Sequence, residues 1–239
     1  MAEDIAPALL EKVQREFHKN LEKAGATKKE LLEKAKGGYL GSITQQSGKV
    51  GKALSRAYLS VLSPEILPDG IMYYNIAEKV MVPTIKEAYD IVSDVADTWQ
   101  LEINKKMGIG IKPIRPPIEE DRLDGLLNAV SNGIFADNMH YLNEPIRNLV
   151  EHFSDNHTRE NCRFLDSSGV KVYVTRVAEA TACEWCQDRA GTYDNYQDAQ
   201  DNEVFARHEG CRCEVSISNG KSGGFMKAAG HAFVRSKTQ

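Results

Sequence analysis

The chain has 239 residues, of which 41% are hydrophobic and 27% are charged, and its formal net charge is −4 at pH 7. This length and composition are typical of one large or two small globular domains. The negative balance excludes the global positive field of a general nucleic-acid-binding protein. No apolar run approaches the roughly 18 residues of a membrane span, and residues 1–10 lack the pattern of a secretory signal. We therefore expect a protein that folds in a reducing cytoplasm and has no membrane partner.

The N-terminal part of the chain predicts amphipathic helices. A first helix is indicated by apolar residues that recur every four positions and so share one face. These residues are Ile5, Leu9, Val13, Phe17 and Leu21. Gly25 ends this helix, and Thr27 with Glu30 has the capping-box spacing that begins another. A further helical face covers residues 50–61 and stops at Pro64.

Two longer helices are predicted farther along the chain. The first carries apolar residues with three-four spacing over residues 85–103, and Pro83 either sits in its first turn or kinks it. The second covers about residues 136–162, and Pro145 within its pattern predicts a kink. Between them, residues 112–117 (KPIRPP) are expected to form a stiff, extended linker. The apolar stripes indicate packing within one core or, alternatively, a coiled-coil contact with a partner.

Strands are predicted after a change of composition near Asp166. Residues 170–177 alternate apolar and polar side chains, as expected for a half-buried strand. A second alternation comprises Cys213, Val215 and Ile217. The two strands bracket a group of cysteines. We expect them to pair as a small antiparallel sheet with the cysteines at one end.

The expected fold class is therefore α+β, with a mainly helical N-terminal body of long amphipathic helices and a small antiparallel C-terminal module. We divide the chain into a helical region at residues 1–112, a long helix or helical connector at 118–165, the module at 166–218 and a flexible basic tail at 219–239. The tail contains Lys and Arg but no acid. It is either an ordinary disordered terminus or the site of a weak contact with DNA phosphates.

The cysteines and one histidine have the spacing of a metal site. Cys183 and Cys186 form a C-x-x-C pair, which lets two thiolates bind one ion. His208 and Cys211 follow in the same module and complete a set of three sulfurs and one nitrogen. Soft sulfur ligands with one imidazole favour zinc over magnesium or calcium. We expect a structural zinc site, because four protein ligands leave no position for water.

This ligand set has alternatives. Cys213 lies two residues beyond Cys211 and could replace either Cys211 or His208 as a ligand. The cysteines could instead be reduced structural thiols or form a disulfide. A catalytic zinc site of the deaminase type is not expected, because no H-x-E triplet precedes the C-x-x-C pair. A Cys–His nucleophilic pair is the remaining alternative.

The cysteine group belongs to a longer pattern that covers residues 174–215. A strand with an arginine is followed by C-x-x-C, an acid and a glycine, and later by H-E-G-C-R-C-E-V. The pattern resembles the C-terminal module of the Mu-F-like phage minor head proteins, the phage head-morphogenesis family, which closes on H-P-x-C-R-C. The matching residues are Arg176, Cys183, Cys186, Asp188, Gly191, His208, Cys211, Arg212 and Cys213. Glu209 departs from the usual proline but removes no ligand.

The resemblance implies a structural minor capsid protein rather than an enzyme. Such proteins occur in a few copies per virion, associate with the portal vertex and capsid interior, and contact the portal or major capsid protein during head assembly and DNA packaging or ejection. We would then expect this chain in the host cytoplasm during assembly and in the virion afterwards. The alternative is a metal-dependent nuclease or other hydrolase acting on DNA, with a hard cation bound by acids. Those acids would be Asp188, Asp194, Asp198 and Asp201.

Overall fold

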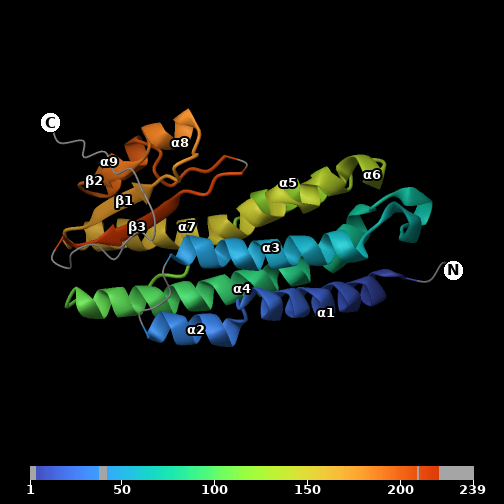
Figure 1. Cartoon of the computed structure of the whole chain (residues 1–239), viewed down its shortest axis with the longest axis horizontal. Helices are drawn as coiled ribbons and strands as arrows, with labels where there is room; N and C mark the ends of the chain where they lie inside the picture. The colour runs from blue at the N-terminus through green and yellow to red at the C-terminus, as the bar shows by residue number, and fades with distance from the viewer. Residues whose placement is uncertain (1–3, 38–41, 209, 221–239) are drawn as a thin grey trace.

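The computed structural model describes residues 4–37, 42–208 and 210–220. In chain order the helices and strands are α1 (Ala6–Ala24), α2 (Lys28–Lys36), α3 (Ile43–Val61), η1 (Pro64–Ile66), η2 (Pro68–Gly70), α4 (Tyr74–Lys106), α5 (Glu120–Val130), α6 (Phe135–Asn138), η3 (Met139–Leu142), α7 (Glu144–Ser167), β1 (Tyr173–Val177), α8 (Glu184–Asp188), β2 (Gly191–Tyr193), α9 (Tyr196–Asp201) and β3 (Glu214–Ser218). Helices fill the N-terminal part, and a small antiparallel sheet lies at one end (Figure 1). The α+β class is confirmed. Most of the predicted tail, residues 221–239, lies outside the described residues.

Helices α1 and α2 begin and end as the local sequence predicts. Gly25 follows α1 with a left-handed φ of 57°, a conformation that glycine adopts without strain. At the start of α2, the Thr27 side chain accepts a hydrogen bond from the backbone N–H of Glu30. The Glu30 carboxylate accepts one from the N–H of Thr27 in return. The predicted capping box is therefore confirmed. The predicted apolar face of α1 is buried at Leu9, Val13, Phe17 and Leu21.

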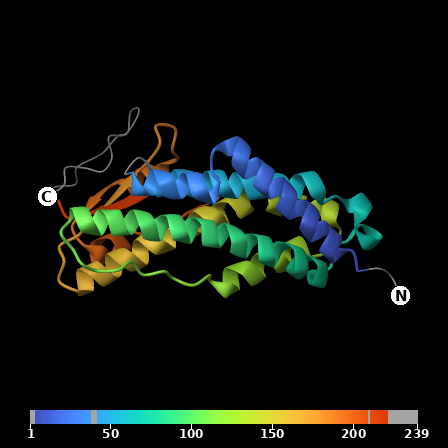
Figure 2. The same ribbon diagram turned by 90° about the horizontal axis from the view of Figure 1, so that it is seen from below.

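The longest helix, α4, has 33 residues and runs along most of the molecule (Figure 2). Pro83 lies well inside α4 rather than in its first turn. The extended segment after α4 turns back along the bundle. The side-chain amide of Asn161 on α7 accepts a hydrogen bond from the backbone N–H of Ile114 and donates one to its carbonyl, at 2.8 Å each. The Tyr89 hydroxyl donates to the carbonyl of Pro116. The predicted linker is thus extended and is held against α4 and α7.

The prediction for the second long helix was wrong at its start. The helix predicted from about residue 136 begins at Glu144 instead, and Pro145 lies in the first turn of α7. Proline is tolerated there because the first N–H groups of a helix have no intrahelical partner, so no kink results. The segment before α7 forms two short helical turns, α6 and η3. Helix α5 lies within the helical connector predicted at 118–165 but before the apolar pattern of residues 136–162, and it buries only Leu123, Leu127 and Val130.

The sheet has the strand order β2-β1-β3, with both pairs antiparallel. The predicted antiparallel pairing of the two strands that bracket the cysteines, β1 and β3, is confirmed by the register Val174↔Ile217 and Arg176↔Val215. Strand β1 begins at Tyr173, three residues later than predicted. Strand β2 was not predicted, because its three residues are too few to display a period.

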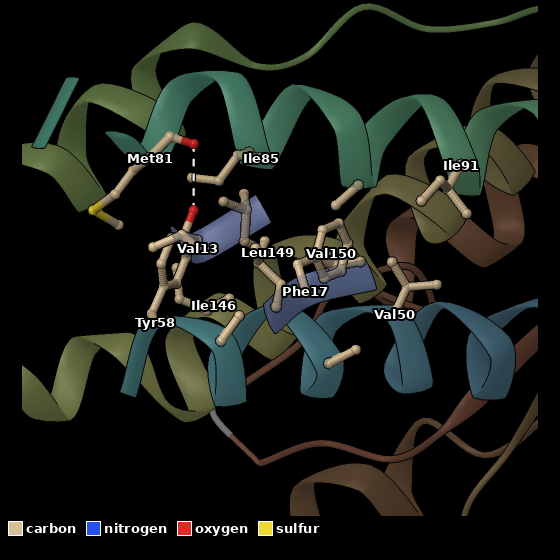
Figure 3. Close-up of a cluster of buried hydrophobic side chains, with 14 of the residues drawn as sticks. Val13, Phe17, Val50, Tyr58, Met81, Ile85, Ile91, Ile146, Leu149 and Val150 are labelled. Carbon is tan, nitrogen blue, oxygen red and sulfur yellow. Dashed lines mark hydrogen bonds between the residues drawn. The ribbon is translucent and has the colours of Figure 1, made fainter. Parts of the chain in front are cut away.

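Two hydrophobic clusters share α7. The larger cluster fills the helical bundle, where the Tyr58 hydroxyl donates to the carbonyl of Met81 (Figure 3). The smaller one packs the sheet against Cys162 and Leu165 at the C-terminal end of α7. Within the described residues, no helix combines the length and apolar character needed to cross a bilayer. Helix α7 therefore positions the sheet, and with it the cysteines, against the bundle.

Candidate metal centre

The predicted ligands come from two loops that the sheet brings together. Cys183 is the N-cap of α8, and Cys186 lies within that short helix after β1. His208 and Cys211 lie in the loop that leads into β3, and Gly210 between them has a φ of 74°. Because β1 and β3 pair directly, the two loops meet at the same end of the sheet. The strand pairing thus brings ligands 25 residues apart into contact.

The distances between ligand atoms suit a shared ion. The Nε2 atom of His208 lies 3.3 Å from Sγ of Cys183 and 3.0 Å from Sγ of Cys186. The Sγ atoms of Cys186 and Cys211 are 3.7 Å apart. Zinc binds nitrogen and sulfur at about 2.0–2.3 Å, so tetrahedral ligands lie about 3.5–3.8 Å from one another. The observed spacings are close to this range without any disulfide: every cysteine in the described residues is a free thiol.

Five donors converge where a tetrahedral ion needs four. Cys183, Cys186 and His208 form one group of convergent ligand atoms, and Cys186, Cys211 and Cys213 form another. Within each group the ligand atoms lie within 4.8 Å of one another. Cys186 is common to both groups and so is the central ligand. Both groups could hold a metal ion, and the choice of fourth ligand between His208 and Cys213 stays open.

The cysteine thiols lie beside the buried guanidinium group of Arg176. Arg176 on β1 is fully buried, and its guanidinium donates to the sulfurs of Cys211 at 3.5 Å and Cys186 at 3.9 Å. It also donates to the carbonyls of Val204 and Ala206. A hydrogen bond from Cys213 lowers the pKa of the Cys211 thiol, and the nearby arginines act in the same direction. The same bond, together with burial, raises the pKa of Cys213.

Trp185 covers one side of the centre. Its ring meets the His208 imidazole edge to face, with centroids 5.3 Å apart. The Arg189 guanidinium lies over the other part of the indole, 3.9 Å from the ring centroid. The side chain between the two cysteines of the C-x-x-C pair thus orients the histidine ligand, and Arg189 orients the indole in turn.

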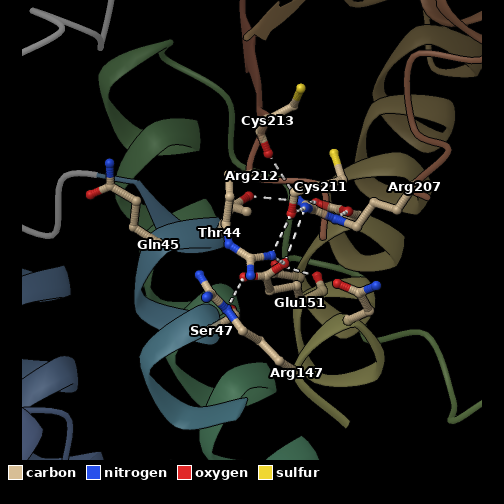
Figure 4. Close-up of polar contacts among 12 residues, drawn as sticks. Thr44, Gln45, Ser47, Arg147, Glu151, Arg207, Cys211, Arg212 and Cys213 are labelled. Atoms are coloured by element: carbon tan, nitrogen blue, oxygen red, sulfur yellow. Dashed lines mark hydrogen bonds and ion pairs between the residues drawn. The ribbon is translucent and has the colours of Figure 1, made fainter. Parts of the chain in front are cut away.

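The loop of His208 is fastened to the helical body by arginines (Figure 4). Arg207 donates to the carbonyls of Cys211 and Cys213 at 3.1 and 2.9 Å. The same guanidinium pairs with Asp155 and Glu151 on α7. Sequence reasoning missed Arg207. The acids at positions 151 and 155 lie one turn apart and, once buried, demand a cationic partner, but their burial is not visible in the sequence.

Arg212 completes the connection. It donates to the carbonyl of Cys211 at 2.9 Å and pairs with Glu144 at the start of α7, 2.6 Å away. Arg176 and Arg212 thus both donate to carbonyls of the loops around the centre. Bonds of this kind fix the backbone that carries the ligands.

The acidic residues of the nuclease alternative do not converge. In the part of the chain that the structure describes, the groups of three side chains whose ligand atoms lie within 4.8 Å of one another both contain cysteines. Asp198 is engaged locally and accepts hydrogen bonds from the N–H of Asp194 and the amide of Asn202. Asp201 accepts one from Gln197. These contacts order the α9 segment.

Comparison of the chain with protein-family models, with curated proteins and with solved structures found no match in any of the three.

Proposed function

We propose that the chain is a structural minor head protein of a tailed phage, with a C-terminal module tied by one zinc ion. The observation that carries the proposal is the convergence of Arg176, Cys186, His208 and Cys211 at one point of the fold. These residues belong to the pattern that resembles the head-morphogenesis family. A resemblance spread over two distant segments gains weight when those segments meet in space.

The donor set argues for a structural ion. Three sulfurs with one imidazole, or four sulfurs, saturate a tetrahedral zinc without water, and catalysis needs an open position. The carbonyls beside the ligands are occupied by Arg207 and Arg212, which hold the loop in place. Metal binding would therefore stabilise the module instead of activating a substrate.

In this role the chain would occur in a few copies at the portal vertex or capsid interior. It would contact the portal or the major capsid protein during head assembly. The neighbouring reading frames of the genome that encodes it should then include a portal protein. Mass spectrometry of purified virions and procapsids is expected to detect the chain together with that portal protein. Its absence from both kinds of particle would contradict the proposal.

The metal prediction is tested separately. Elemental analysis of purified protein is expected to give about one zinc ion per chain. Cys186→Ser should abolish binding, because Cys186 belongs to both ligand groups. Cys162→Ser is the matched control. That thiol is buried on α7 outside both groups, and burial raises its pKa to about 12. Equal zinc content in the two variants would rule out the centre.

A further inference from the structure

One end of the helical bundle exposes apolar side chains. Seven large hydrophobic residues are at least 38% exposed in the described part of the chain. Four of them belong to two segments that meet at the isolated bridge between Ile71 and Ile134: three lie on the segment from η1 to the start of α4, and Ile134 itself precedes α6. We name this group the apolar tip: Ile66, Tyr73, Tyr74 and Ile134, which are 43%, 41%, 39% and 60% exposed. Single exposed apolar residues are ordinary, but a cluster of them marks a contact surface.

The surroundings of the tip are acidic. Residues 57–78 and 123–141 together contain five acids and no Lys or Arg, and the three bases that flank these ranges are Arg56, Lys79 and Arg122. The five acids are Glu65, Asp69, Glu78, Asp124 and Asp137. The Tyr73 hydroxyl donates a hydrogen bond to Asp69. Burial raises the pKa of the Tyr74 hydroxyl, and the negative charges of Asp124 and Glu78 raise it further. The surface therefore fits a ligand that combines apolar side chains with positive charge.

Residues 221–239 have that chemistry. They contain Lys221, Lys227, Arg235 and Lys237, no acid, and two apolar pairs. The pairs are Phe225–Met226 and Phe233–Val234. The positive charge of this segment is complementary to the acids around the tip, and its apolar side chains are complementary to the apolar tip itself.

The apolar tip lies at the opposite end of the molecule from Gly220, the last described residue before this segment. Figure 1 shows α6 at one end and the sheet at the other, and the described chain ends at Gly220 beside Tyr173 of β1. Helix α4, with 33 residues, separates these ends by about 50 Å at 1.5 Å per residue. The 19 residues 221–239 span at most about 65 Å when fully extended. Crossing that distance would consume most of the segment before its apolar pairs reached the tip.

We propose that residues 221–239 of one chain bind the apolar tip of a second copy, so that copies associate head to tail. Such an interface joins two different surfaces and extends into rings or open chains unless one surface is blocked. The inference rests neither on the metal centre nor on the phage assignment. It assigns a protein partner to the basic segment in place of DNA.

The experiment measures the mass of the full chain in solution by light scattering. The wild type should associate as its concentration rises, and added salt should weaken the association because opposite charges meet. Ile134→Asp should weaken it by at least about tenfold, which corresponds to 1.4 kcal/mol. This variant should fold, because Ile134 is exposed and occupies the N-cap of α6, where aspartate is favoured. Leu101→Asp, on α4 and also 38% exposed, is the matched control and should associate like the wild type.

A mixing experiment tests the head-to-tail arrangement. Phe233→Asp should also prevent self-association, since it removes an apolar residue of the segment. Mixed together, the Ile134→Asp and Phe233→Asp chains should form a one-to-one dimer, because each retains the surface that the other lacks. A wild type that remains a monomer would overturn the inference. So would assembly that Ile134→Asp leaves intact, a mixture that does not associate, or a segment that binds duplex DNA while the chains stay monomeric.

Discussion

Arg207 is the side chain that joins the metal loop to the helical body. It is only 7% exposed, and its partners Glu151 and Asp155 are 2% and 3% exposed. At this depth water cannot replace a lost partner, so each charge depends on the others. Burial raises the pKa of Glu151, and the neighbouring arginines oppose that shift. Arg207, Glu151 and Asp155 therefore stabilise the fold as one network, in which the effect of removing one side chain depends on the other two.

Removing this cation should be costly. Arg207→Met is expected to lower the free energy of unfolding by about 3–5 kcal/mol, because Asp155 would be left buried without its counter-charge and Glu151 would keep only Arg147 and Arg212. Arg115→Met is the control. Its ion pairs with Asp94 and Asp97 are partly exposed and should contribute at most about 1 kcal/mol. Urea unfolding followed by circular dichroism measures both. Similar losses in the two variants would show that the network is not tightly coupled.

Helices α3 and α7 approach closely because α3 carries glycines where they cross. A Cβ atom on Gly51 would lie 2.9 Å from Cα of Arg147 and 3.1 Å from its carbonyl oxygen. A Cβ atom on Gly48 would lie 2.5 Å from a carboxylate oxygen of Glu151. The backbone of α7 cannot move without disturbing the arginine network that it carries. The crossing therefore depends on the absence of side chains on α3.

Alanine at this crossing should be unfavourable although alanine usually favours helices. Gly51→Ala is expected to destabilise the protein by about 1–3 kcal/mol, as overpacking does. Gly125→Ala on α5 is the matched control, since a Cβ atom added at that position would have no neighbour within 4 Å. That change should stabilise the protein by about 0.4–1 kcal/mol. Thermal and urea unfolding compare the two, and a stabilising Gly51→Ala would disprove the tight crossing.

The molecule as a whole combines a bundle core with a separate cysteine cluster. The bundle cluster ends at Phe153 of α7, whereas Ala178, Cys186, Ala190, Cys211 and Cys213 form a small cluster of their own. Five small buried residues offer little apolar area, so the metal would supply most of the stability of this region. The bundle, in contrast, has its own large hydrophobic core.

Metal removal should therefore act locally. A chelator is expected to abolish hydrogen-exchange protection across residues 178–190 and 210–213, which carry the cysteine cluster, and to leave α1, α3 and α4 protected. The same chelator added to Cys186→Ser protein should cause no further change. Protection that survives chelation throughout residues 178–190 and 210–213 would show that the module folds without metal. Loss of protection across the bundle would show that Arg207 couples the two parts more strongly than their separate cores suggest.

Local features of this protein were predictable from sequence because they depend on neighbours along the chain. The capping box of Thr27 and Glu30, the end of α1 at Gly25 and the alternation of β1 and β3 are of this kind. The proximity of Cys183 and Cys186 is also local, because C-x-x-C spacing keeps two sulfurs close enough to share an ion. The start of α7 was misplaced because Pro145 fits either a kink or a first turn, and only packing distinguishes them.

The remaining features depend on which distant segments meet. Antiparallel pairing of β1 with β3 brought Cys213 to the centre beside the predicted ligands. Arg207 pairs with Glu151 and Asp155 because both acids are buried against its loop. The sequence around position 207 contains no pattern that predicts these ion pairs. The sequence by itself thus determined the periods, the caps and the kinds of donor atoms. The tertiary structure decided which candidate ligand atoms and which charged groups lie together away from water. Side chains lose their hydration and come together only after the chain has packed.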